Sequence, residues 1–200
     1  MTEPTPFQLD ALKEIVNIGV GKAAASLNEL VEAHIVLEVP RISMFRAEDP
    51  DSDTTGLATS TLSCVQLGFH GIFNGTAALV FPPVSAAKLV AALTGENPET
   101  PNLNAVMAGT LNEVGNIIIN SVIGTIGNIL GKSFDYSLPN YLEGRLVELL
   151  RPNDLQVLVT VLLVQTRFCI EDLEVEGNIF LIFELGSFDV LLASLDALRL

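Results

Sequence analysis

The stretch that decides the fold is DALKEIVNIGVG at residues 10–21, which returns in diverged form as GTLNEVGNIIIN at residues 109–120. At about 100° of rotation per residue, the apolar residues of each stretch fall on one side of a helix. The other side carries a Glu followed three positions later by an Asn, first Glu14 with Asn17 and then Glu113 with Asn116. The sequence therefore predicts two amphipathic helices that each present a carboxylate and an amide to solvent.

The similarity between the two halves extends beyond these helices. At an offset of 99 residues Pro40 falls on Pro139, and the alternating Ile35, Leu37 and Val39 fall on Phe134, Tyr136 and Leu138. Farther along the offset becomes 102, where Gly75 meets Gly177 and Ser85 meets Ser187. Each half reads as a helix, three strands and a short helix. We therefore expect residues 1–200 to form one domain made of two internal repeats, at about residues 5–97 and 102–200.

Capping residues and alternating hydrophobicity set the expected boundaries of the elements. Thr5 with Gln8 three residues later is a capping-box signal for a helix that runs to about Val31. Ser85 is expected to cap a short helix that ends at Leu93. Strands are expected at about residues 34–39, 57–67 and 72–81. The predicted fold class is α+β with pseudo-twofold symmetry, an antiparallel-rich sheet and the long helices packed on it.

The composition of the chain argues against one class of partner. The chain has 24 acidic against 10 basic residues and a formal net charge of -14. Surfaces that bind nucleic acid need clustered Lys and Arg, so nucleic acid is not expected as a partner. The acidic excess is explained either by solubility of a chain that is 49% hydrophobic or by electrostatic steering of a partner.

The remaining reactive side chains indicate neither a metal nor a cofactor. Cys64 and Cys169 are far apart and have no His or Cys at metal-ligand spacing, so we expect two buried, reduced thiols. His34 and His70 likewise lack a nucleophile or ligand partner at informative spacing. Residues 1–7 do not form a signal peptide, and no uninterrupted apolar run reaches the ~18 residues of a membrane span. A cytoplasmic location without membrane insertion is expected.

One spacing is repeated. Glu-x-x-Asn is followed after 22 residues by Pro in both halves, at Glu14, Asn17 and Pro40 and again at Glu113, Asn116 and Pro139. A single Glu and Asn pair is ordinary on the polar side of an amphipathic helix. Two pairs with the same distance to a Pro favour a function, although a duplication makes the two copies non-independent.

This pattern resembles the CheC/CheX/FliY phosphatases of bacterial and archaeal chemotaxis. Their motif is Asp or Ser, three residues, Glu, two residues, Asn, 22 residues and Pro. Asp10 completes the first copy, whereas Gly109 occupies the corresponding position of the second. Because members with two sites in roughly 200 residues are CheC-like, the chain is most similar to the CheC members.

The resemblance implies a phosphatase that hydrolyses the aspartyl phosphate of a CheY-type response regulator. Asn17 and Asn116 would orient the attacking water, and Glu14 and Glu113 would pair with a Lys of the regulator. Any Mg²⁺ would belong to the partner receiver domain. The alternative is a non-catalytic adaptor of the same fold that binds CheD or a flagellar or receiver partner.

The other residues of the two stripes have supporting roles in this interpretation. Asp10, Gly21 and Asn120 extend the stripes and are expected to support or contact the partner. Gly21 is explained either as a tolerated small residue or as clearance for another backbone. Pro40 and Pro139 are expected to be structural, at a bend or an edge of the strand that follows each helix. The first site has the complete motif, so it ranks above the second.

Overall fold

The computed structural model describes residues 3–30, 34–46, 61–95, 103–150, 160–170 and 173–199. Its helices are α1 (Pro6–Leu30), α2 (Pro83–Thr94), α3 (Leu103–Leu130), α4 (Leu146–Leu150) and α5 (Ser187–Asp196), with a 3-10 turn at Ala197–Arg199. Its strands are β1 (Ile35–Arg46), β2 (Thr61–His70), β3 (Gly75–Phe81), β4 (Asp135–Tyr136), β5 (Asn140–Arg145), β6 (Thr160–Ile170) and β7 (Leu173–Phe183).

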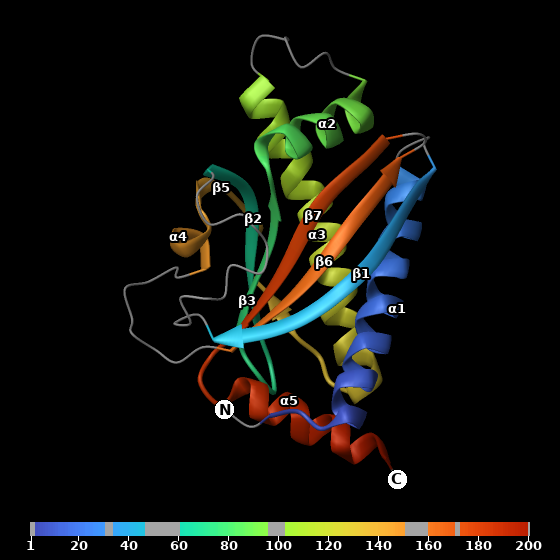
Figure 1. Cartoon of the computed structure of the whole chain (residues 1–200), viewed down its shortest axis with the longest axis vertical. Coiled ribbons are helices and arrows are strands. Elements are labelled where there is room, and N and C mark those ends of the chain that lie inside the picture. The colour runs from blue at the N-terminus through green and yellow to red at the C-terminus, as the bar shows by residue number, and fades with distance from the viewer. Residues whose placement is uncertain are drawn as a thin grey trace.

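The strands form one antiparallel sheet of seven strands in the order β1-β6-β7-β3-β2-β4, with β5 also paired to β2. Both long helices cover the same face of this sheet, and α2 and α5 lie at its two ends (Figure 1). The predicted α+β class with an antiparallel-rich sheet and long helices packed on it is confirmed.

The outer ladders of the sheet have the same register in the two halves of the chain. Leu37 of β1 pairs with Phe168 of β6, and 99 residues on, Tyr136 of β4 pairs with Phe69 of β2. Both ladders also end on an Arg and Thr pair, Arg46 with Thr160 and Thr61 with Arg145. This shared register supports the proposal that the domain consists of two internal repeats, with β3 and β7 at the seam between them.

Helix α1 begins at the predicted capping box. The Thr5 N–H donates to Oε1 of Gln8 (2.8 Å), and the Gln8 N–H donates to Oγ1 of Thr5 (3.3 Å). Gln8 is also 95% buried, and its Nε2 donates to the Leu192 carbonyl (3.2 Å) and to Asp196 (2.9 Å) in α5. The same side chain therefore starts the first helix and fastens it to the last.

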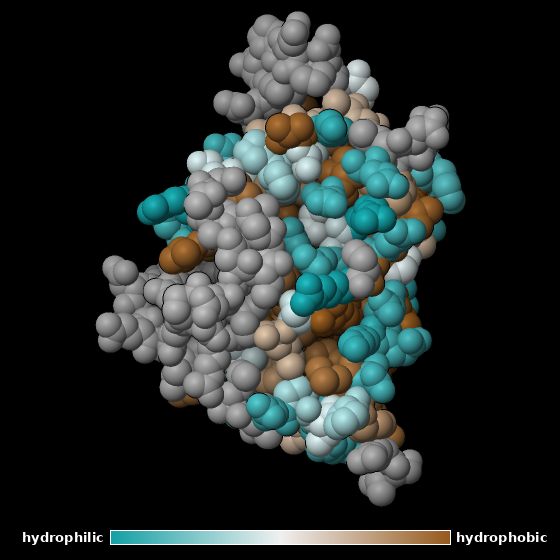
Figure 2. Space-filling view, viewed as in Figure 1, coloured by the Kyte–Doolittle hydropathy of each residue, from teal (hydrophilic) through white to brown (hydrophobic). Residues whose placement is uncertain are grey.

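A single large core fills the space between the helices and the sheet. Val16 and Leu27 of α1, Ile118 of α3 and Phe81 and Phe183 of the sheet are among its fully or almost fully buried members. A smaller cluster lies on the opposite face of the sheet, where Leu146 and Leu149 of α4 join buried residues of β2, β3, β6 and β7. The coloured part of that face has hydrophobic patches between hydrophilic side chains (Figure 2).

Several expected boundaries were wrong, and the reasons are local. Ser85 does not cap α2, because the helix begins at Pro83 with Pro82 at the N-cap position, where the fixed φ of proline favours a helix start. The hairpin between β2 and β3 turns at residues 71–74, directly after His70. Residues 57–60 and Val31 lie outside the described residues.

The second half also contains features that its first-half counterpart did not predict. The strand after α3 is divided into β4 and β5 around Pro139, and a short helix, α4, follows β5. Cys64 is buried as expected, but Cys169 is only partly buried, because it lies on β6 near the end of the sheet. Both histidines, His34 and His70, are exposed.

Helix α3 is the longest of the described helices and the more apolar of the two long ones. By length and composition its segment Ala105–Leu130 could cross a membrane, and 50% of that apolar stretch is buried inside the fold. Here it packs on α1 and on β2, where the Gly115 backbone lies against the side chain of Val65. Core helices commonly have this composition.

Candidate functional site

The first predicted stripe is exposed along α1. Asp10, Glu14, Asn17 and Gly21 all lie on the solvent side of the helix, whereas Val16 and Val20 between them are buried. Within the described part of the chain, no hydrogen bond or ion pair restrains the Glu14 or Asn17 side chain. The structure thus places the four residues together and leaves the carboxylate and amide free to reach a partner.

The second stripe is less exposed and more tightly held. Gly109 and Glu113 are exposed on α3, but Asn116 and Asn120 are half-buried. Nδ2 of Asn120 donates a hydrogen bond to Oδ1 of Asn116 (2.8 Å). Oδ1 of Asn120 is buried and accepts no hydrogen bond from any described residue. The structure brings the predicted residues together here too, with an amide pair that α1 does not have.

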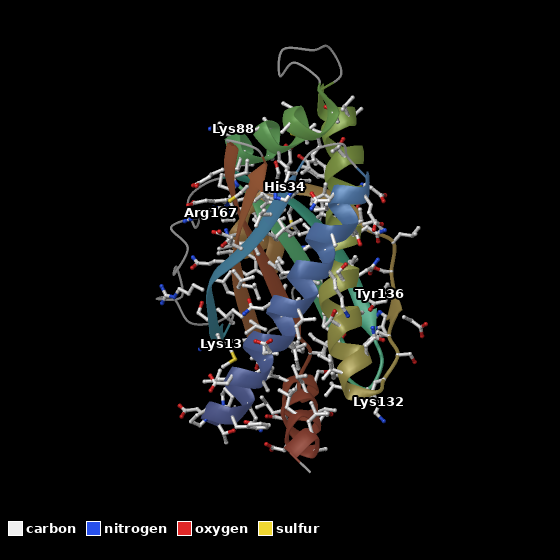
Figure 3. The ribbon with its side chains drawn as sticks, turned by 90° about the vertical axis from the view of Figure 1, so that its right-hand side faces the viewer. Lys13, His34, Lys88, Lys132, Tyr136 and Arg167 are labelled. Carbon is white, nitrogen blue, oxygen red and sulfur yellow. The ribbon has the colours of Figure 1, made fainter. Side chains whose placement is uncertain are left out.

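The two stripes lie on opposite flanks of the helix pair. Helices α1 and α3 run antiparallel side by side (Figure 3), and the Gly19 backbone of α1 lies against Val122 of α3. Asn17 is two residues from Gly19, or about 160° round the helix, and Asn116 is about 120° from Val122. Each Asn therefore faces away from the contact between the helices, so a partner could approach either site without meeting the other helix first.

The two glycines of the stripes have open space around them. A Cβ built on Gly21 or on Gly109 meets no atom within 4 Å. Neither glycine is required by the packing of this chain, and either position has room for a side chain. At Gly109 the missing Asp or Ser is therefore a chemical difference between the sites, because the fold has space for it.

The two motif prolines sit at matching interruptions of the sheet. Pro40 lies in β1 where the pairing with β6 changes register between Glu38 and Arg41. Pro139 lies between β4 and β5, where the ladder with β2 is interrupted. Proline has no N–H for a ladder, so it occurs at bulges and edges. Both prolines end the first part of an edge strand beside the long helix.

Tyr136 is a residue of the second site that the sequence patterns did not single out. Its hydroxyl lies 3.7 Å from the position of a Cβ on Gly124, one turn beyond Asn120, on the side of α3 away from α1 (Figure 3). Burial against the helix raises the pKa of this phenol above its usual value. The alignment of the two halves indicates this position, because an aromatic and polar side chain, Tyr136, stands where the first half has Leu37.

Metal-binding groups are not gathered at either stripe. Among the described residues, no group of three or more His, Cys, Asp or Glu side chains is placed to hold a metal ion. The chemistry that the two stripes offer is therefore that of one carboxylate and one or two amides on a helix surface: pairing with a cation, and donating and accepting hydrogen bonds to a small polar molecule.

Two models of known protein families match this chain. The model of the family described as "Chemotaxis phosphatase CheX" matches residues 63–162, and that of the CheC-like family matches residues 7–44. A curated relative is the CheY-P phosphatase CheC of Bacillus subtilis (strain 168), which is 26% identical over 136 residues. That match covers 66% of this chain and 64% of the relative, so it spans a little under two thirds of the relative's length.

Solved structures share the fold. Thermotoga maritima FliY superimposes with a TM-score of 0.72 at 20% identity, covering 98% of this chain and 99% of that one. The FliM middle domain of H. pylori gives a TM-score of 0.64 at 11% identity, covering 95% and 99%. A chemotaxis protein CheX from Desulfovibrio desulfuricans gives a TM-score of 0.52 at 13% identity, covering 86% and 99%.

Proposed function

This chain belongs to the CheC/CheX/FliY family of chemotaxis phosphatases, and we propose that it removes the phosphoryl group from the aspartyl phosphate of a CheY-type response regulator. The observation that carries the proposal is the pair of outward-facing Glu-x-x-Asn sites. Glu14 with Asn17 and Glu113 with Asn116 occupy the outer sides of two adjacent helices, with apolar residues of the same helices buried in the core.

An amide side chain suits this reaction. An aspartyl phosphate is an activated acyl phosphate, and its hydrolysis needs a water molecule in line with the bond that breaks. Asn17 or Asn116, inserted beside the phosphoryl group, donates and accepts hydrogen bonds and so holds that water in the attacking position. The amide does not itself compete as a nucleophile, which leaves charge stabilisation to groups of the regulator.

The glutamates have a binding role in this scheme. Glu14 and Glu113 precede their Asn by one helical turn and are exposed, so each reaches a cation of the partner, for which a Lys of the regulator is the candidate. A charged hydrogen bond that becomes shielded on docking contributes about 1–3 kcal/mol. This contact fixes the helix across the regulator's site, and Asp10 and Gly21 extend the docking surface of α1.

The rest of the scheme concerns the partner and the setting. Mg²⁺ is proposed to be held by the receiver domain of the regulator, with no cofactor held by this chain. We place the reaction in the cytoplasm, where response regulators act, and keep CheD as a second candidate partner. Neither nucleic acid nor a membrane is needed.

The test is the rate of phosphate loss from a CheY-type regulator phosphorylated with a small-molecule phosphodonor. Four proteins are compared: wild type, Asn17→Ala, Asn116→Ala and the double variant. The double variant is expected to lose the acceleration, by at least about tenfold, because misplacing a reacting group by an ångström costs up to about 100-fold. A double variant as fast as wild type would exclude both amides from the reaction.

An adaptor without catalytic activity is the second candidate, because the same fold occurs in the FliM middle domain and in a FliG–FliM complex of H. pylori. The same assay separates the two functions. A wild-type chain that binds the phosphorylated regulator or CheD yet leaves the dephosphorylation rate unchanged is an adaptor.

A further inference from the structure

The two candidate sites differ in how their amide is held. In α3 the Oδ1 of Asn116 accepts a hydrogen bond from Nδ2 of Asn120, one turn later (2.8 Å). In α1 the position that corresponds to Asn120 is Gly21, at the offset of 99 residues, and Asn17 has no hydrogen-bond partner among the described residues. One catalytic amide is therefore tethered by a neighbour, and the other is free to rotate.

An apolar side chain at position 120 would be expected to stabilise the fold at least as well as Asn120 does. Asn120 is half-buried, and its Oδ1 has no donor in the described structure. A buried acceptor without a donor is unfavourable, and an intrahelical pair between side chains contributes only weakly to stability. The hydrogen bond to Asn116 is thus better explained by what it does to Asn116 than by what it adds to the fold.

The bond fixes the direction of the Asn116 amide. An Asn amide offers two N–H donors on one side and a carbonyl oxygen on the other, and a rotation of 180° exchanges them. With one lone pair of Oδ1 held by Asn120, the N–H groups and the second lone pair keep constant directions. A half-buried setting beside Asn120 also restricts the side-chain rotamers of Asn116, whereas Asn17 is exposed.

We propose that Asn120 is a positioning residue for Asn116, and that it makes the carboxy-terminal site the preorganised one of the two. This inference rests on the proposed phosphatase function. It reverses the ranking from the sequence motif, which favoured the first site because of Asp10. Ordering one side chain in advance corresponds to about a three- to tenfold gain in rate, which appears in kcat because the amide acts on the water and not on docking.

The inference is tested in a chain whose first site is disabled by Asn17→Ala. Into this background are placed Asn120→Ala and Asn120→Asp. Asn120→Ala removes the donor, and kcat is expected to fall about three- to tenfold while KM for the phosphorylated regulator and the melting temperature stay the same. Asn120→Asp has the same shape but only accepts, so it draws Nδ2 of Asn116 toward itself, reverses the amide and also lowers kcat.

The reciprocal experiment builds the tether into the first site. In a chain with Asn116→Ala, Gly21→Asn places an amide one turn after Asn17, and a Cβ there meets no atom within 4 Å. Gly21→Ala in the same background is the matched control, because it makes the same backbone change without the amide. The ratio of kcat for Gly21→Asn over Gly21→Ala is expected to exceed one by a few fold.

A measurement without any regulator tests the contact itself. The side-chain amide signals of Asn116 in an NMR spectrum are expected to shift and to show increased mobility in Asn120→Ala. If these signals are unchanged, or if Asn17→Ala with Asn120→Ala turns over as fast as Asn17→Ala alone, the positioning role is wrong. A wild-type chain without phosphatase activity would instead overturn the proposed function, and with it the kinetic part of this inference.

Discussion

Gly19 of α1 lies directly against Val122 of α3: a Cβ built on Gly19 would lie 2.8 Å from the Val122 Cα and 3.2 Å from the Ser121 carbonyl oxygen. Because the obstacle is backbone, the helices would have to move apart to admit even a methyl group. The contact sets the distance between the two helices that carry the candidate sites.

Replacing this glycine is therefore expected to be destabilising. Gly19→Ala should lower the free energy of unfolding by about 1–3 kcal/mol, the usual cost of inserting an extra methyl group into a well-packed contact. Gly21→Ala, two residues along the same helix and in open space, should raise it by up to about 1 kcal/mol through helix propensity. Urea denaturation of both variants measures the difference, and equal stabilities would mean that the helices separate freely.

Gln8 is expected to matter more than a helix cap. It takes part in the capping box with Thr5 and bonds to the Leu192 carbonyl and Asp196 of α5. Gln8→Ala should cost about 2–3 kcal/mol, because it leaves buried groups without partners as well as removing a cap. Thr5→Ala is the matched control and should cost about 1 kcal/mol, since only the cap is lost. If the two changes cost the same in thermal unfolding, the link to α5 contributes nothing.

Thr125 offers a stabilising substitution. It is 98% buried in α3, and its hydroxyl has no hydrogen-bond partner among the described residues. Thr125→Val keeps the shape and removes the unpaired group, so the free energy of unfolding should rise by about 1 kcal/mol. Thr110→Val on the same helix, where the side chain is only half-buried, should change it by less. A loss of stability in Thr125→Val would show that the hydroxyl has a partner.

The Cys64 thiol should be unreactive in the folded protein. It should also make the free energy of unfolding depend on pH in the alkaline range. Burial raises the pKa of its thiol from 9.0 to about 12. Between these values the unfolded chain loses the thiol proton while the folded chain keeps it, so stability should fall as the pH rises above about 9. Unfolding of wild type and of Cys64→Ala between pH 8 and 11 compares the slopes, which should be shallower in the variant.

The same thiol can be followed by chemical modification. At pH 8 a disulfide reagent such as DTNB should modify the partly buried Cys169 much faster than Cys64, because only thiolates that solvent reaches will react. Modification of Cys64 is expected only after denaturant is added. Fast reaction of both thiols in the folded protein would contradict the burial of β2.

The parts of this fold that the sequence predicted are those encoded locally. The capping box at Thr5 and the polar stripe of Glu14 and Asn17 depend on residues within one or two helical turns, and helical periodicity is enough to find them. The antiparallel sheet followed from alternation in the strands. The start of α2 was missed because Pro82 and Pro83 end one element and begin the next, and Ser85 was a plausible competing cap.

The rest depends on contacts between distant segments. Neither the seam of β3 with β7 nor the bond from Gln8 to α5 has a local signature. At the second site, the spacing placed Asn116 and Asn120 on one stripe, but only the rotamers show that one amide binds the other. Tyr136 escaped notice because a single aromatic residue in a strand is ordinary until the opposing helix is known to have Gly124 beside it.

The matching ladders have a consequence for the connections between them. Arg46 and Thr61 are separated by 14 residues, and so are Arg145 and Thr160, and these four residues form the last pair of each ladder. Connections normally tolerate insertions better than strands do, yet here the two strand sequences have diverged while the lengths of the crossings have not. Because each of these segments is bounded by the last residues of two different ladders, a change in its length is expected to disturb the pairing of both ladders more than a change in residue identity does.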